Sequence, residues 1–86
     1  MERSEIFIIE RELMEDFEMI MVASSNILAI GYREDIQTLR VQFLNGSTYE
    51  YTNFPLIEFE QFRNASSLGS YLNHNIRGKY PTNKVG

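Results

Sequence analysis

The reactive side chains of this 86-residue chain are too few to assemble a catalytic centre. His74 is the sole histidine, and because the sequence has no cysteine it cannot complete a zinc site. Ser70 lies one helical turn before His74, but nothing in the sequence would orient the imidazole as a general base. We therefore expect no catalytic residues, no metal and no cofactor, and a protein that is not an enzyme.

A set of polar and basic residues toward the C-terminus is better suited to binding an anion. A helix predicted to begin after Ser66 or Ser67 offers free backbone N–H groups in its first turn, which attract phosphate. Tyr80 could stack on a base, although it equally fits a hydrophobic plug at the end of the helix. The candidate nucleic-acid-binding residues are Arg63, Ser66, Ser67, Gly69, Asn73, His74, Arg77, Lys79 and Tyr80.

Charge is unevenly distributed along the chain, whose net charge is −4. Residues 1–20 carry seven acidic and two basic side chains, whereas residues 61–86 carry four basic side chains and no acidic one. This asymmetry is typical of a segment that binds polyanions, or of an acidic segment that folds back on a basic one. The simpler interpretation is that both segments are solvated surface.

Tyr49-Glu50-Tyr51 follows the hairpin signal Asn45-Gly46, so the strand register decides whether the two rings face the core or the solvent. A two-residue loop would expose both rings and direct Glu50 inward, where an unpaired carboxylate is costly. A three-residue loop with Gly46 in the left-handed conformation turns the rings inward and Glu50 outward. We predict the second register, and with it a mainly structural role for Tyr49 and Tyr51.

Three segments around this hairpin have the alternation of apolar and polar residues that predicts antiparallel strands. Residues 27–33 place Leu28, Ile30 and Tyr32 on one face, and Gly31 on the other face leaves space for close packing. The other two strands are expected over about residues 39–43 and 48–52.

Two helices are predicted to follow the strands. Pro55 suits the first turn of the first helix, in which Leu56, Phe59 and Phe62 share a face. The second helix ends before Gly78, a favoured residue just beyond a helix C-terminus. Its apolar stripe consists of Leu68, Tyr71, Leu72 and Ile76.

Residues 1–20 form an acidic amphipathic extension, in which a helix is expected from about Ser4 to Phe17. A helix of this length is marginal alone and needs a partner for its apolar stripe. No apolar run is long enough to span a membrane, and the N-terminus does not resemble a secretory signal, so we expect a cytoplasmic protein. The apolar stripe of the extension consists of Ile6, Ile9, Leu13, Phe17 and Ile20.

A further set of motifs occurs in a fixed order between about residues 21 and 80. They are Ser24-Ser25-Asn26-Ile27, Ala29-Ile30-Gly31-Tyr32, the apolar alternation ending at Asn45-Gly46, Tyr49-Glu50-Tyr51, Pro55, Ala65-Ser66, Gly69, Tyr71 and Ile76. In this respect the chain resembles the KTSC domain, a module named for its occurrence at the C-terminus of some lysyl-tRNA synthetases. Arg33 and Phe54 depart from the pattern, which favours an acidic and a smaller residue there. The resemblance implies a small bacterial α+β module with a suggested role in RNA binding and no catalytic residues.

Together these features predict an α+β domain, a three-stranded antiparallel meander packed against two C-terminal helices, with an additional N-terminal amphipathic helix. The domain would cover residues 21–80, preceded by the extension 1–20 and followed by a flexible tail, 81–86. The expected function is non-catalytic, low-specificity RNA binding through the basic C-terminal helical surface. The alternative is a protein-interaction module that dimerises or docks on a partner through residues 4–20.

Overall fold

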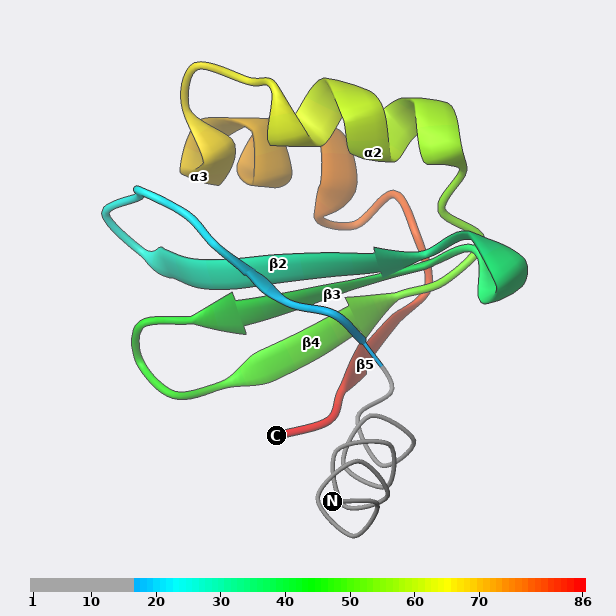
Figure 1. The fold of residues 1–86 in the computed structure, drawn as a ribbon, viewed down its shortest axis with the longest axis horizontal. Helices are drawn as coiled ribbons and strands as arrows, with labels where there is room; N and C mark the ends of the chain where they lie inside the picture. Colours follow the sequence, from blue (N-terminus) through cyan, green and yellow to red (C-terminus); the bar gives the residue numbers. More distant parts are fainter. Residues whose placement is uncertain (1–16) are drawn as a thin grey trace, which may run out of the picture.

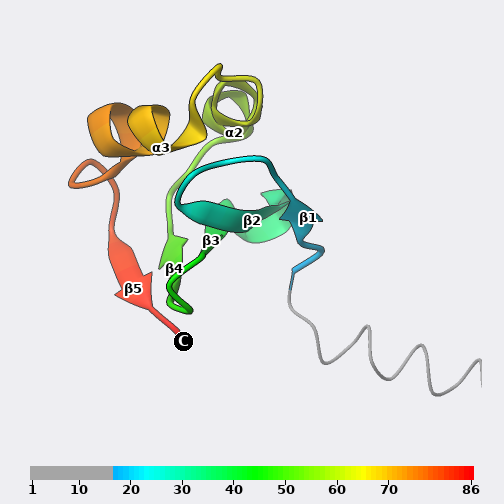
Figure 2. The same ribbon diagram turned by 90° about the vertical axis from the view of Figure 1, so that its left-hand side faces the viewer.

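The computed structural model describes residues 17–86 as two layers, an antiparallel sheet with helices over one of its faces (Figure 1). Strand order follows the sequence, and Figure 2 shows β1 and β5 at opposite edges of the sheet. The strands are β1 (Ile20–Met21), β2 (Ile27–Arg33), β3 (Thr38–Phe43), β4 (Thr48–Tyr51) and β5 (Thr82–Lys84). The helical segments are η1 (Glu34–Ile36), α2 (Leu56–Arg63), α3 (Leu68–Tyr71) and η2 (Leu72–Ile76).

The predicted α+β class is therefore confirmed, but the predicted sheet of three strands is wrong. The sheet has five strands, because a short strand is added at each edge of the predicted meander. Most of the predicted N-terminal helix, residues 4–16, lies outside the described residues, and Phe17 lies in the segment that leads into β1.

The predicted flexible tail contains β5, which pairs with β4. Backbone groups account for this pairing, since the Thr48 N–H donates to the Gly86 carbonyl at 3.1 Å and the Thr52 N–H donates to the Pro81 carbonyl at 3.0 Å. All three residues of β5 are polar and exposed. Main-chain hydrogen bonds, and no apolar pattern, therefore specify this strand.

The turn between β3 and β4 has the predicted three-residue geometry. Gly46 has a φ of 96°, and the Phe43 N–H donates to the Ser47 carbonyl at 2.8 Å. The Asn45 side-chain oxygen accepts hydrogen bonds from the backbone N–H and the hydroxyl of Ser47, which fixes the turn.

The register that follows from this turn is also the predicted one. Leu39 lies opposite Tyr51 and Val41 opposite Tyr49, so these side chains share the face that is covered by the helices. Glu50 is on the other face, where it pairs with Arg40 and so avoids the cost of an unpaired buried carboxylate.

The helices cover this face with the apolar side chains that the sequence predicts. Phe59 and Phe62 of α2 are buried, as are Leu72 and Ile76, which follow α3. The Ser67 hydroxyl accepts a hydrogen bond from the Ser70 N–H and caps α3, as expected of a serine at this position. These residues pack onto Leu39, Val41, Tyr51 and the fully buried Phe54.

A bulge changes which residues of β2 face the helices. The pairing with β3 shifts between Ile27 and Ala29, so Ile27, at 1% exposure, takes the inward position predicted for Leu28. Beyond the bulge, Ile30 and Tyr32 face inward as predicted.

The opposite, outer face of the sheet is partly covered by the chain that precedes β1. A Cβ on Gly31 would lie 2.7 Å from the Met19 sulfur and 2.9 Å from the Glu18 carbonyl oxygen. Phe17 is only 5% exposed, and the Arg40 guanidinium carbon lies 4.3 Å from the centre of its ring. Gly31 thus provides the space for close packing that the sequence predicts.

The second C-terminal helix widens before it ends. After α3 the chain makes one π turn, η2, in which the Arg77 N–H donates to the Leu72 carbonyl, five residues back, at 2.8 Å. Gly78 follows with a φ of 78°, a conformation that suits glycine at this point.

Candidate functional site

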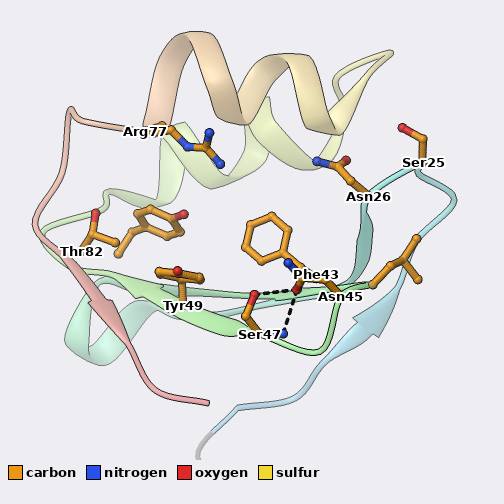
Figure 3. A pocket seen from close by; sticks show the side chains of 10 residues that line it. Ser25, Asn26, Phe43, Asn45, Ser47, Tyr49, Arg77 and Thr82 are labelled. Atoms are coloured by element: carbon orange, nitrogen blue, oxygen red, sulfur yellow. Dashed lines mark hydrogen bonds between the residues drawn. The ribbon is translucent and has the colours of Figure 1, made fainter.

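A cavity of about 630 Å³ lies between the sheet and the end of the helical layer (Figure 3). Four separate segments contribute to it: the β1–β2 loop, the β3–β4 hairpin, the residue after η2, and β5. We call it the C-terminal pocket, and its lining residues are Ser25, Asn26, Phe43, Leu44, Asn45, Ser47, Tyr49, Tyr51, Arg77 and Thr82.

Three aromatic rings from β3 and β4 form the floor of the C-terminal pocket. Phe43 and Tyr49 meet edge to face, with ring centres 5.8 Å apart and planes at 82°. Tyr51 is 3% exposed and belongs to the core, whereas Tyr49 is only partly buried. In Figure 3 Phe43 and Tyr49 rise from the sheet, and the Tyr49 ring lies over it with one face toward the space below the helix.

Arg77 reaches into the pocket from above, at the point where the wide turn of η2 ends (Figure 3). Its guanidinium makes no hydrogen bond or ion pair to any residue in the described part of the chain. Burial raises the pKa of Tyr51, and the positive charge of Arg77 opposes part of this rise, which indicates that the two groups interact.

The Tyr51 hydroxyl also opens onto the pocket. Within residues 17–86 it has no hydrogen-bond partner. Every side-chain nitrogen or oxygen that is fully buried in this part of the chain does have one. This hydroxyl must therefore be accessible from the cavity, where it can bond to a ligand or to water.

The rim of the pocket is formed by two loops at one end of the sheet. The Leu44 N–H donates to the Asn26 carbonyl at 2.9 Å and joins the loops. In the β1–β2 loop, the Ser24 hydroxyl oxygen accepts hydrogen bonds from the N–H groups of Asn26 and Ile27. The Ser24 hydroxyl also donates to the side-chain oxygen of Asn26 at 3.2 Å, and the NH2 group of this side chain can donate to a ligand in the pocket.

The pocket has a positive electrostatic character. Its lining includes Arg77 and no acidic residue. Lys84 lies directly opposite Tyr49 in the β4–β5 pair and so projects from the same face of the sheet. Glu50 of β4 projects from the other face, where its Oε2 lies 3.0 Å from Nε of Arg40.

The predicted nucleic-acid-binding residues do not form one surface. Ser66, Ser67 and His74 line a shallow hollow of about 250 Å³, together with Ser70, whose carbonyl lies 2.9 Å from Nδ1 of His74. Arg77 instead lines the C-terminal pocket, which Tyr49 and Tyr51 also line. The structure thus divides the predicted site between two depressions.

The remaining predicted residues lie elsewhere. Gly69 approaches the β1–β2 loop so closely that a Cβ there would lie 2.7 Å from the Asn26 side-chain oxygen. Tyr80 packs against Phe54 with ring centres 4.6 Å apart, which is the plug that the sequence offered as its alternative role. Arg63, Asn73 and Lys79 are exposed and line neither depression.

Sequence reasoning missed Phe43 and the rim as parts of a site. Phe43 looked like one more core residue of an alternating strand, and the rim residues looked like turn formers. The available signal was topological, because in an antiparallel meander the β1–β2 and β3–β4 loops emerge at the same end of the sheet.

Two kinds of feature are absent from the described residues. No group of three or more histidine, cysteine, aspartate or glutamate side chains in this part of the chain is arranged to hold a metal ion. Among residues 17–86, no helix has both the length and the apolar character that crossing a bilayer requires.

The fold and the C-terminal pocket define a small α+β module with a concave, positively charged depression. The family model of the KTSC domain matches residues 23–80, and the chain belongs to this family. The crystal structure of a KTSC domain protein from Yersinia pestis superimposes with a TM-score of 0.77 at 37% sequence identity, covering 81% of this chain and 99% of that one.

Similar sequences also occur in much larger bacterial proteins. The lysine–tRNA ligases of Trichormus variabilis and of a Nostoc species are each 38% identical to this chain over 64 residues, and that of Nostoc punctiforme is 36% identical. The match covers 74% of this chain but only 11% of each ligase. The chain thus corresponds to a small part of these relatives.

Proposed function

We propose that this chain is a non-catalytic module that binds single-stranded RNA with low sequence specificity. The observation that carries the proposal is that the basic side chains near the C-terminus are not paired with acidic groups. In the described part of the chain none of them forms an ion pair with an acidic group, so all can neutralise phosphate: Arg63, Arg77, Lys79 and Lys84.

The basic residues of the outer face differ in this respect. Arg33 pairs with Asp35 at 2.7 Å and Arg40 pairs with Glu50 at 2.5 Å. Their charge is therefore compensated within the chain. The uncompensated positive charge lies in residues 61–86, which contain no acidic residue.

Aromatic side chains favour single-stranded over duplex RNA as the ligand. Phe43 and Tyr49 stand at the C-terminal pocket, and unpaired bases stack on such rings whatever their sequence. The matched relatives are named as lysine–tRNA ligases, so related modules occur in proteins that act on an RNA.

The test is a titration of fluorescently labelled oligouridine at several salt concentrations. If three or four phosphates are neutralised, log affinity falls with log salt with a slope of about −2 to −3. Arg63→Gln should flatten this slope by about 0.7, the contribution of one phosphate to a single strand. Arg33→Gln is the matched control, because it removes the same charge from the outer face and should leave the slope unchanged.

Absence of binding at low salt, or a slope near zero, would overturn the proposal. It would also fail if Arg33→Gln weakened binding as much as Arg63→Gln does, because the contact would then not involve the C-terminal third.

A second proposal, protein interaction through residues 4–20, is supported by the apolar edge of the sheet. Ile20 and Met21 of β1 are 48% and 69% exposed. An edge strand also offers backbone groups with which another chain can pair. The remainder of the proposed interface, residues 4–16, lies outside the described residues.

A further inference from the structure

The C-terminal pocket contains two polar groups that have no hydrogen-bond partner in the described part of the chain. The Arg77 guanidinium and the Tyr51 hydroxyl face the cavity and form no hydrogen bond within residues 17–86. Tyr51 itself is 3% exposed, so its hydroxyl is held in a fixed position by the core. Arg77 is exposed, so its guanidinium is free to meet a ligand, and a few polar groups placed around an apolar floor are typical of a ligand site.

The chemistry of the pocket selects an anion that carries a flat apolar ring. Arg77, with no acid beside it, favours a negative group, and its planar guanidinium suits phosphate oxygens. The partly buried ring of Tyr49, which Phe43 meets edge to face, favours a planar apolar ring as its partner. The side-chain NH2 groups of Asn26 and Asn45 on the rim can donate hydrogen bonds to the edge of a nucleobase, while their oxygens already accept hydrogen bonds from Ser24 and Ser47.

The dimensions agree with one such ligand. A cavity of about 630 Å³ lies within the range of about 300–1,000 Å³ that is usual for small-molecule sites. The helical layer and the sheet lie on opposite sides of it, so a base on Tyr49 and a phosphate at Arg77 would occupy different walls (Figure 3).

From these observations we infer that the C-terminal pocket binds one nucleoside monophosphate unit, with its base stacked on Tyr49 and its phosphate at Arg77. This inference rests on the proposed function, in which the unit is an unpaired nucleotide of an RNA strand. The Tyr51 hydroxyl and the rim amides bind the sugar and the edge of the base.

The test measures the affinity of the full chain for adenosine 5′-monophosphate, adenosine and ribose 5-phosphate by NMR titration. The monophosphate should bind at least tenfold more tightly than either half, because it alone engages both walls. Tyr49→Leu keeps an apolar side chain but removes the aromatic face, and should lower the affinity for the monophosphate by roughly tenfold to a hundredfold. Tyr49→Phe should bind as the unaltered chain does.

The phosphate wall is tested with a pair of matched variants. Arg77→Gln should reduce the affinity of the monophosphate to that of adenosine, whereas Arg33→Gln, the same change on the outer face, should have no effect. Amide signals of β3, β4 and the β1–β2 loop should shift on titration, and they confirm that each variant is folded.

Equal affinities for the monophosphate and ribose 5-phosphate would overturn the inference, since the ring would then contribute nothing. If oligouridine binds with the expected salt slope but Tyr49→Leu leaves its affinity unchanged, the pocket inference fails and the proposed function stands. If neither the strand nor the monophosphate binds, both fail. If the monophosphate binds but oligouridine does not, the pocket inference stands, with a free nucleotide as its ligand, and the proposed function fails.

Discussion

At the scale of single residues, Glu58 organises the polar groups between the two parts of the helical layer. Its carboxylate accepts a hydrogen bond from the Tyr71 hydroxyl at 2.6 Å. Burial and then this carboxylate raise the pKa of Tyr71 to about 12. The pKa of Tyr80 is also raised, first by burial and then by the charge of Glu58.

This arrangement predicts a loss of stability in alkaline solution. Because the pKa of Tyr71 is higher in the folded chain than its ordinary value of 10.0, its contribution is fully present below about pH 10 and is lost as the pH rises toward 12. We expect the free energy of unfolding, measured with urea, to fall less steeply over this range for Tyr71→Phe than for the unaltered chain. Equal pH dependence of the two would contradict the prediction.

The role of Glu58 itself is tested by Glu58→Gln. Removing the negative charge should lower the pKa of Tyr71 toward its ordinary value, although burial, the larger cause, remains. Tyrosine ionisation is followed by ultraviolet absorbance as the pH is raised. Subtracting the curve of the double variant Glu58→Gln, Tyr71→Phe from that of Glu58→Gln gives the titration of Tyr71 alone.

At the scale of elements, the segment from Phe17 to Met19 covers the outer face of the sheet at Gly31. We expect Gly31→Ala to destabilise the chain by about 1–3 kcal/mol, the usual cost of overpacking. The added methyl would meet the Glu18 carbonyl oxygen at 2.9 Å, and backbone moves aside less easily than a side chain. Chemical denaturation measures the change.

Met19→Ala separates the two contacts that the new methyl would make. Combined with Gly31→Ala it removes the sulfur at 2.7 Å but leaves the carbonyl of Glu18, so it should restore only part of the stability. Full restoration would show that the side chain alone is crowded, and no loss in the single variant would show that the segment does not pack there.

Elements that carry a strong side-chain pattern were predictable from the sequence. Asn45-Gly46 and the cost of burying Glu50 together determined the hairpin register, and the apolar stripe around Phe59 and Phe62 determined the first helix. Thr82–Lys84 could not be predicted as a strand, because its residues are all polar and only backbone pairing specifies them.

The C-terminal pocket was less predictable than the fold. Its walls come from segments as distant as Asn26 and Thr82, and no sequence spacing brings them together. The bulge near Ala29 likewise has no glycine to mark it, so Leu28 was assigned to the wrong face. Arg77 was identified as a binding residue, but its placement away from His74 depends on where its helix ends.

At the scale of the whole molecule, the two faces of the sheet differ in composition. The covered face holds the core and, at one end, the C-terminal pocket. The outer face holds ion-paired arginines and the ring of Phe17. RNA binding and association through the N-terminal edge would therefore use different parts of the molecule.

This separation allows the second proposal to be tested independently. If residues 4–20 join two copies, sedimentation should show a dimer for the full chain and a monomer for a chain that begins at Phe17 and so keeps the ring packed on the sheet. A monomer in both cases would contradict dimerisation. RNA affinity per chain should be the same in both, because the C-terminal pocket is intact.

The direction of the Arg77 side chain depends on the one additional residue in the π turn η2 that precedes it. Each residue of an ideal α-helix advances about 100° around the axis, at 3.6 residues per turn. In η2 the bond to Leu72 spans one residue more than an α turn does, and so it alters the angular position of every residue that follows. In a related chain one residue shorter at this point, the same arginine would point in a direction that differs by about 100° around the helix axis. A sequence alignment alone would not reveal this difference.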